Sequence, residues 1–270
     1  MDMKKKLCIY ISSPSSYSDI FNIFIRCFEK KWRDCSYPIV ISTDCKKELS
    51  EKYDVRLIDS KYNNWVTRTI ECLKQIDYEY ILLMMDDALI MNSVDESLIE
   101  EIVFDMDRYN IDYCKLTAAK KGLLYKDSRL LNIVSKETPY AKNIFMGIYR
   151  RSFLLNELGD GSLSAWDIEK KWLDESKNAI KGDFFDNVVL CNRVVINAPN
   201  AVIGGKWFPS IKKKIIKMGI PIESERESVS RIQEIKMNTG AKLGNSLPPR
   251  MRRGLKKMLA AFGMSFATEK

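Results

Sequence analysis

Four short apolar runs, each followed by polar residues, occupy the first 90 positions of the chain. Their length, and the lack of polar residues at helical spacing inside them, predict strands buried on both faces of a largely parallel sheet. The runs span residues 6–12, 38–43, 55–58 and 80–85. Between them, residues 19–32 and 65–76 place apolar side chains on one face of a helix. Strands alternating with helices predict right-handed crossovers and an α/β fold.

The second half of the chain has shorter and more alternating apolar patterns. Helical spacing predicts helices at residues 95–109, 151–158 and 166–176. Alternation between polar turns indicates antiparallel additions to the sheet. These strands are expected at residues 113–117, 123–125, 130–134 and 143–149, and a further strand-like run at 194–203.

Composition limits the class of protein. With 270 residues, 46% of them hydrophobic, the chain suits one large domain, alone or with an appendage. No run approaches the roughly 20 apolar residues that span a bilayer, so neither a transmembrane helix nor a signal peptide is expected. Seven scattered cysteines without a C-x-x-C pair predict reduced thiols in a cytosol.

Histidine is absent, which excludes Ser-His-Asp and Cys-His catalysis and His-ligated zinc. Glycine-rich phosphate loops and the G-x-G-x-x-G turn are also missing, which argues against P-loop NTPases and dinucleotide oxidoreductases. Residues 206–270 hold 15 Lys or Arg and 5 Asp or Glu, whereas residues 1–205 hold 29 Lys or Arg and 31 Asp or Glu. This uneven charge does not fit a nucleic-acid-binding domain, so we expect no nucleic-acid partner.

Two adjacent carboxylates, Asp86 and Asp87, follow the most apolar of the four runs. Ligands of open α/β sheets bind just beyond the carboxyl ends of such strands. A pair of carboxylates there forms a hard oxygen site, suited to Mg²⁺ or Mn²⁺ that carries a nucleotide diphosphate. The alternative is that the pair only caps a turn or the next helix.

Four segments, taken in order, resemble bacterial glycosyltransferases with the GT-A fold, of the kind encoded in capsule and O-antigen gene clusters. They are WVTR at 65–68, YILLMMDDALI at 80–90, SAWDIE at 164–169 and GGKW at 204–207. The resemblance implies a GT-A-like, Rossmann-like fold with a mixed, mainly parallel sheet flanked by helices. It further implies one domain, with a nucleotide-binding and an acceptor-binding half and a tail. The implied boundaries are about 1–95 and 96–220 within a domain of 1–245, and 246–270 for the tail.

On the donor side, the resemblance implies that Asp86 and Asp87 replace the family's D-x-D element, with Asp87 as the favoured direct ligand of the metal. The family's late histidine ligand has no counterpart here. Lys206 is expected to neutralise the leaving diphosphate instead, although a Gly-Gly turn with one lysine is common. For Arg68, packing and a surface salt bridge are the alternative. The implied donor-binding residues are Ser12, Ser13, Asp44, Arg68, Asp86 and Lys206.

On the acceptor side, the SAWDIE segment resembles the family's acidic motif, in which a carboxylate at a helix start takes the proton of the attacking hydroxyl. Asp167 is the first candidate for this catalytic base and Glu169 the second. Trp166 is expected to stack on an acceptor sugar ring. The alternative is that both carboxylates only favour a helix N-terminus.

The tail predicts an amphipathic helix over 250–266, with apolar side chains on one face and basic ones beside it. Such a helix is typical of binding to an anionic membrane surface, although packing on the domain or in a homodimer would use the same face.

Taken with the resemblance, the sequence predicts a glycosyltransferase, inverting and metal-assisted, that moves a sugar from a nucleotide-diphosphate sugar to a hydroxyl of a lipid-linked glycan. It would act in the cytoplasm on the inner face of the membrane. Two alternatives stay open: a nucleotidyltransferase, and a non-catalytic protein that binds nucleotide or glycan. Turnover of a sugar nucleotide separates the three classes.

Overall fold

The computed structural model describes residues 6–45, 50–51, 53–116 and 122–237. The chain divides into two compact units, Met1–Asn200 and Ala201–Lys270, and each is described by itself. The tail, 246–270, and the membrane-binding helix that we predict within it lie outside the described residues.

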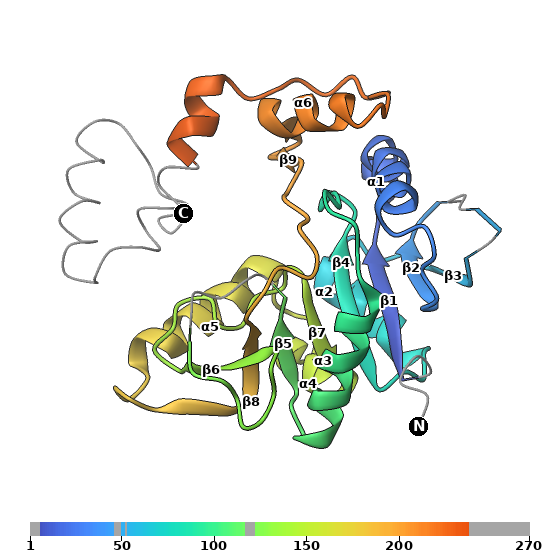
Figure 1. The fold of residues 1–270 in the computed structure, drawn as a ribbon. Coiled ribbons are helices and arrows are strands. Elements are labelled where there is room, and N and C mark those ends of the chain that lie inside the picture. The colour runs from blue at the N-terminus through green and yellow to red at the C-terminus, as the bar shows by residue number, and fades with distance from the viewer. Residues whose placement is uncertain (1–5, 46–49, 52, 117–121, 238–270) are drawn as a thin grey trace. The chain divides into compact units, whose positions relative to one another are not determined.

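An eight-stranded sheet forms the centre of the first unit, with strand order β3-β2-β1-β4-β7-β5-β8-β6 (Figure 1). β1 to β4 are parallel to one another, as the four apolar runs predict. β7 runs antiparallel to both β4 and β5, while β5 is parallel to β8 and β6 is antiparallel to β8. The bounds are β1 (Leu7–Ser12), β2 (Ile39–Thr43), β3 (Val55–Asp59), β4 (Tyr80–Met85), β5 (Tyr113–Lys115), β6 (Leu131–Ser135), β7 (Gly147–Arg150) and β8 (Phe184–Cys191).

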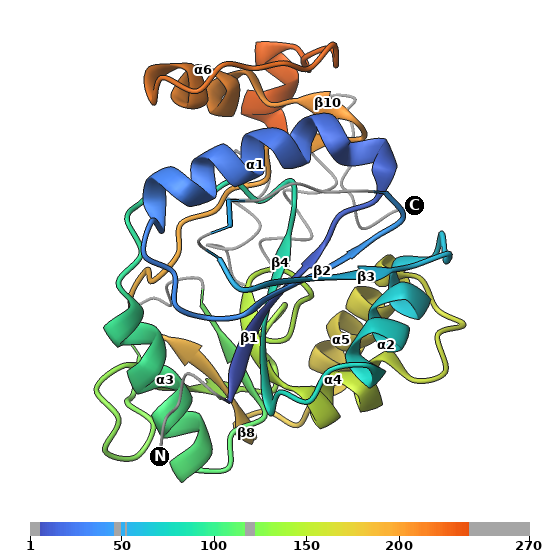
Figure 2. The same ribbon diagram turned by 90° about the vertical axis from the view of Figure 1, so that its right-hand side faces the viewer.

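Helices cover both faces of this sheet, as Figures 1 and 2 show together. One face carries α1 (Ser18–Lys31), preceded by the short helix η2 (Ser15–Tyr17), and α3 (Glu96–Arg108). The other face carries α2 (Trp65–Lys74), α4 (Arg151–Leu158) and α5 (Ala165–Asn178). The predicted fold class, a mixed and mainly parallel α/β sheet flanked by helices, is therefore confirmed.

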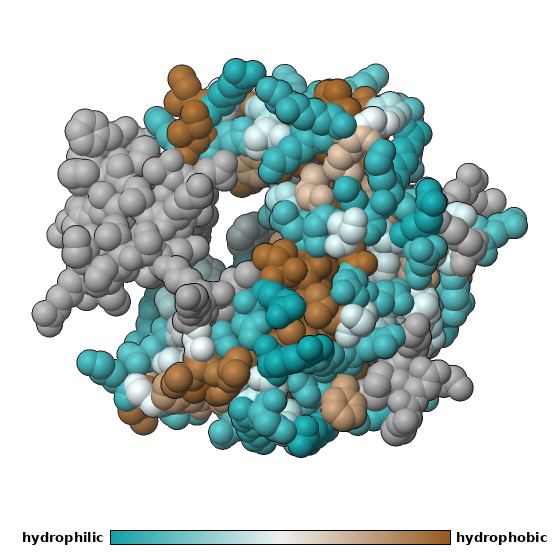
Figure 3. Space-filling model, viewed as in Figure 1, coloured by the Kyte–Doolittle hydropathy of each residue, from teal (hydrophilic) through white to brown (hydrophobic). Residues whose placement is uncertain are grey.

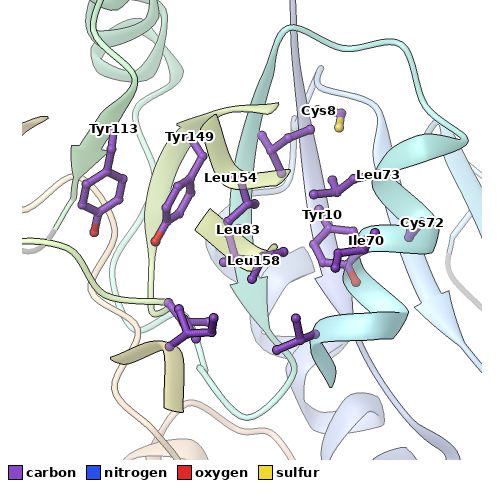
Figure 4. Packing of buried hydrophobic residues seen from close by; sticks show 14 of the residues in the cluster. Cys8, Tyr10, Ile70, Cys72, Leu73, Leu83, Tyr113, Tyr149, Leu154 and Leu158 are labelled. Carbon is purple, nitrogen blue, oxygen red and sulfur yellow. The ribbon is translucent and has the colours of Figure 1, made fainter. Parts of the chain in front are cut away.

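Between the sheet and α2, α4 and α5 lies a continuous apolar core (Figure 4). Tyr10 of β1 points to α2, where its hydroxyl donates to Thr69 Oγ1 at 3.1 Å. On the neighbouring strands β5 and β7, the rings of Tyr113 and Tyr149 stack with centroids 4.4 Å apart. These buried aromatic side chains hold the strands and helices in fixed register, because large rings leave little room for sliding.

Three strand predictions in the second half are wrong in part or in full. Within 194–203, only the last two residues are strand, whereas the real strand β8 lies at Phe184–Cys191 and was not predicted. Asp186 and Asn187 interrupt its apolar residues, and its first half alternates between exposed and half-buried positions. Residues 123–125 form an isolated bridge at Leu124 instead of a strand, and 143–149 becomes a loop that enters β7 only at Gly147.

In the second unit, β9 (Val202–Ile203) and β10 (Lys206–Trp207) pair as an antiparallel hairpin. Gly204 and Gly205 turn it with φ angles of 53° and 77°, which glycine adopts without a Cβ penalty. The helix α6 (Pro209–Lys217) follows. Ser210, in its first turn, donates from its backbone N to the buried Glu234 carboxylate.

On the face shown in Figure 3, apolar side chains form separate patches within a mostly hydrophilic surface. Within the described ranges, none of the helices combines the length and the apolar character needed to traverse a bilayer.

Candidate functional site

Strand register brings the ends of four strands to one edge of the sheet. Ser12 of β1 pairs with Met85 of β4, Leu83 of β4 pairs with Gly147 of β7, and Gly147 pairs with Lys115 of β5. We call this the carboxyl edge. The strand order also changes direction between β1 and β4, since β2 and β3 lie on one side of β1 and β4 on the other. Such a topological switch point is where doubly wound sheets bind ligands.

Buried polar groups gather at the ends of β1 and β3. The hydroxyls of Ser12, Ser13 and Ser60 are buried and find no hydrogen-bond partner among the described residues, and neither does the indole Nε1 of Trp65 at the start of α2. Buried polar groups in proteins are nearly always paired with protein or water, because an unmade hydrogen bond costs about 1–3 kcal/mol. Ser12 and Ser13 lie at the end of β1, directly at the switch point, whereas Ser60 and Trp65 follow the edge strand β3.

Asp44, just after β2, holds the loop that follows β1. Ser15 donates to its carboxylate from the backbone N at 2.5 Å and from Oγ at 2.8 Å. Burial acts in the opposite direction, but these hydrogen bonds lower the pKa of Asp44, with help from the charge of Arg68. Arg68 is itself buried, and its Nε donates to the Tyr62 carbonyl at 3.1 Å. It is therefore an interior cation whose charge acts on Asp44, and it forms no ion pair with another described residue.

The two aspartates form a turn directly after β4. Ala88 N closes the turn on the Met85 carbonyl at 3.0 Å, and the chain then pairs with a distant segment. Leu89 N donates to the Pro199 carbonyl at 3.2 Å, and Met91 N to the Asn197 carbonyl at 2.8 Å. The turn is thus fixed on one side by β4 and on the other by residues 197–200.

Within this turn, Asp86 is 4% exposed and Asp87 is half-buried. Burial raises the pKa of Asp87 to about 6, because the carboxylate is enclosed by protein. Among the described residues, no group of three or more His, Cys, Asp or Glu side chains could hold a metal. Two carboxylates nevertheless fit a cation that also binds substrate, since Mg²⁺ is commonly held by one or two carboxylates together with phosphate oxygens. The site fits a metal shared with a diphosphate.

Asp167, the first candidate for the base, is part of a helix cap. Its backbone N donates to Ser164 Oγ at 3.2 Å, and its Oδ2 accepts from Ser164 N at 3.0 Å and from Ser164 Oγ at 2.6 Å. This capping box starts α5. The Ser164 hydrogen bonds lower the pKa of the exposed Asp167 carboxyl, which makes it a weaker base.

Glu169, the second candidate, has a different environment. Burial raises its pKa, partly offset by a hydrogen bond from Ile144 N at 3.2 Å and by the charge of Lys115. Trp166 precedes it by three residues on α5, so the two share a helix face, and Trp166 is 76% exposed. This helix face thus presents a partly desolvated carboxylate next to an open aromatic surface.

The loop at 140–146 ties Glu169 to the carboxyl edge. Lys115 Nζ donates to the Tyr140 carbonyl at 2.5 Å, and Tyr113 OH donates to Asn143 Oδ1 at 3.0 Å. The Tyr149 hydroxyl donates to the Asn143 carbonyl. Side chains from β5, β7 and α5 therefore all hold the same short segment, which places Glu169 at the end of β5.

Lys206, in the second unit, pairs with Glu227 Oε2 at 2.6 Å. Its role at the leaving diphosphate stays a prediction, as do the donor-binding and catalytic roles of the other residues. Sequence reasoning missed Ser60 and Lys115. Ser60 follows β3 directly and Lys115 is the last residue of β5, but neither stands beside a second residue of its kind, as Asp86 does.

The fold is that of an α/β protein with a mainly parallel sheet, and buried serine hydroxyls lie at its switch point. Doubly wound sheets of this class bind nucleotides at that position. No known family model and no curated protein matches the sequence.

Solved structures of similar fold include S. aureus TarS 1–349, with 13% identity and a TM-score of 0.48 over 92% of this chain and 68% of that one. The same protein in complex with UDP-GlcNAc has 14% identity and a TM-score of 0.47, over 92% of this chain and 69% of that one. CMP:2-keto-3-deoxy-manno-octonic acid synthetase complexed with CTP has 11% identity and a TM-score of 0.44, over 79% of this chain and 98% of that one. At TM-scores below 0.5, these likenesses carry no argument about the activity of this chain.

Proposed function

We propose that the chain is a glycosyltransferase that moves a sugar from a nucleoside diphosphate sugar to a hydroxyl group of a glycan. One observation carries the proposal: the Asp86–Asp87 turn at the switch point and the half-buried Glu169 carboxylate occupy the same edge of one sheet. The first suits a diphosphate with its cation, and the second suits a base for a hydroxyl.

The nucleoside would bind beside Ser12, Ser13 and Asp44, where the buried serine hydroxyls have no hydrogen-bond partner among the described residues. Arg68 adds a buried positive charge on the same side. Asp87, with Asp86, would hold Mg²⁺ or Mn²⁺, which supplies charge neutralisation for the departing diphosphate. The chain's own part is to orient the donor and to keep water from it.

On the acceptor side, we assign the base to Glu169 in preference to Asp167. A general base works best with a pKa near the operating pH; burial moves Glu169 towards that range, and the capping hydrogen bonds move Asp167 away from it. The acceptor hydroxyl gives its proton to Glu169, and its oxygen bonds to the anomeric carbon. The bond to the diphosphate breaks, and the nucleoside diphosphate leaves with the electron pair. Single displacement of this kind inverts the anomeric centre.

Trp166 would stack on the acceptor sugar, because its open ring lies on the helix face of Glu169. A lipid-linked acceptor, and docking on the cytoplasmic face of the membrane through 250–266, belong to the same proposal. Their support is the basic and amphipathic sequence of the tail.

A nucleotidyltransferase would also use a carboxylate pair at the switch point. The presence of Glu169 favours the proposal of sugar transfer, because a base separate from the cation-binding pair, Asp86 and Asp87, can accept the proton of a hydroxyl acceptor. The products decide between the two: sugar transfer releases a nucleoside diphosphate, whereas nucleotidyl transfer releases pyrophosphate.

The first test is thermal unfolding with UDP-, GDP-, CMP- and dTDP-sugars, with and without Mn²⁺. A ligand at about 100 times its dissociation constant stabilises by roughly 2.7 kcal/mol. Asp87→Asn should lose the Mn²⁺-dependent part of the stabilisation. Asp77→Asn is the control, since Asp77 is fully exposed and contacts Arg151 at the start of α4. Equal Mn²⁺ dependence in the wild type and Asp87→Asn would refute the assignment of the cation site.

A further inference from the structure

Lys115 is the last residue of β5, and it is half-buried. Its Nζ donates to the Tyr140 carbonyl at 2.5 Å. From the other side, Glu169 of α5 accepts from Ile144 N in the same loop at 3.2 Å. A lysine and a glutamate are thus fastened to one short loop, at backbone positions four residues apart.

We propose that Lys115 is a positioning residue for Glu169: its ammonium faces the Glu169 carboxylate across the 140–144 loop and keeps that carboxylate ionised and turned toward the carboxyl edge. The inference rests on the proposed function, in which Glu169 accepts the proton of the acceptor. It adds a second residue to the acceptor side and explains why a lysine ends a buried strand.

The surroundings of Glu169 identify Lys115 as the group that acts. Tyr113 of β5 and Tyr149 of β7 also face Glu169, but burial raises the pKa of both phenols well above the usual value, so they stay neutral. From the loop, Ile144 N donates to Glu169, while the cation Lys142 pairs with Glu157 and Glu175 instead. Within the described part of the chain, Lys115 is therefore the cation that favours the charged form of Glu169.

Burial alone would protonate the base and stop it from working. An opposite charge nearby typically lowers a carboxyl pKa by about 1–3 units. Burial also lowers the pKa of Lys115 to about 8, so the lysine is charged at neutral pH and its influence fades above that. Because its Nζ is bonded to the Tyr140 carbonyl, Lys115 acts on Glu169 through its charge.

The test is a pH titration of the Glu169 carboxyl carbon by NMR, in full-length protein labelled with ¹³C at glutamate side chains. Loss of one resonance in Glu169→Gln assigns it. Lys115→Met should raise the measured pKa of Glu169 by about one unit or more, Lys115→Gln should do the same, and Lys115→Arg should restore the wild-type value. Lys171→Met is the control, because Lys171 lies on the same helix but pairs with Glu157.

An unchanged Glu169 pKa in both Lys115→Met and Lys115→Gln would overturn the inference, as would an equal rise in Lys171→Met. The readout needs no substrate, so it is separate from the proposed function. If Glu169→Gln retains full sugar transfer while the Lys115 variants still change the Glu169 pKa, Glu169 is not the base. In that case the electrostatic coupling of Lys115 to Glu169 has no catalytic role.

Discussion

Gly147 allows a sharp prediction about packing at the carboxyl edge. A Cβ at this position would lie 2.5 Å from Tyr113 Cε2 and 3.2 Å from the Cys114 carbonyl oxygen. Carbon atoms in contact prefer about 3.5–4.0 Å, so Gly147→Ala must displace the Tyr113 ring by about 1 Å. That ring is held by stacking on Tyr149 and by its hydrogen bond to Asn143. Overpacking of this kind typically costs about 1–3 kcal/mol.

Urea unfolding measures the effect. We expect a free energy of unfolding about 1–3 kcal/mol below that of the wild type with an unchanged m-value, since the surface exposed on unfolding is the same. Tyr113→Leu, alone and combined with Gly147→Ala, completes a double-mutant cycle, and relief of the clash should appear as coupling of about 1 kcal/mol or more. Wild-type stability in Gly147→Ala, or additive effects in the cycle, would refute the reasoning.

Three further outcomes are expected. Glu169→Gln should lower sugar transfer at least about 100-fold, and Asp167→Asn should lower it far less; the reverse order, in initial rates, would return the base to Asp167. Because burial raises the pKa of Glu169, its ionisation costs folded-state stability as pH rises through the native pKa. Glu169→Gln should therefore be more stable than the wild type at neutral pH and equal to it well below pH 4.5, and a less stable variant at neutral pH in thermal unfolding would contradict this. Truncation after Asn245 should release the protein from anionic vesicles and leave nucleotide binding intact, whereas identical co-sedimentation would argue against docking through 250–266.

In the parallel half of the fold, β1, β2 and β4 could be predicted because they are buried on both faces, and continuous apolar runs are then unambiguous. β8 escaped prediction because polar residues interrupt its pattern. Asn187, for example, donates to Asp112 Oδ2 at 2.7 Å, a partner 75 residues away that no local pattern indicates. The run at 194–203 is apolar but contains Pro199, and it follows an irregular path against the aspartate turn.

The candidate site was predictable to a similar degree. Asp86 and Asp87 follow directly from the strand that precedes them. The choice between Asp167 and Glu169 did not follow from the sequence pattern as we interpreted it. A serine three residues before an acidic residue is nevertheless the sequence sign of a capping box, and it assigns Asp167 to the helix start. The coupling of Glu169 to Lys115 depends on a loop between distant strands, which only the folded chain brings together.

The pairing of residues 88–91 with 197–200 makes the aspartate turn depend on chain beyond the last strand of the sheet. A polypeptide ending after Cys191 would contain all eight strands of the sheet and both carboxylates of the turn. It would lack the Asn197 and Pro199 carbonyls that hold the chain leaving that turn. The support of the aspartate turn therefore extends beyond the sheet to Asn200, where the first compact unit also ends.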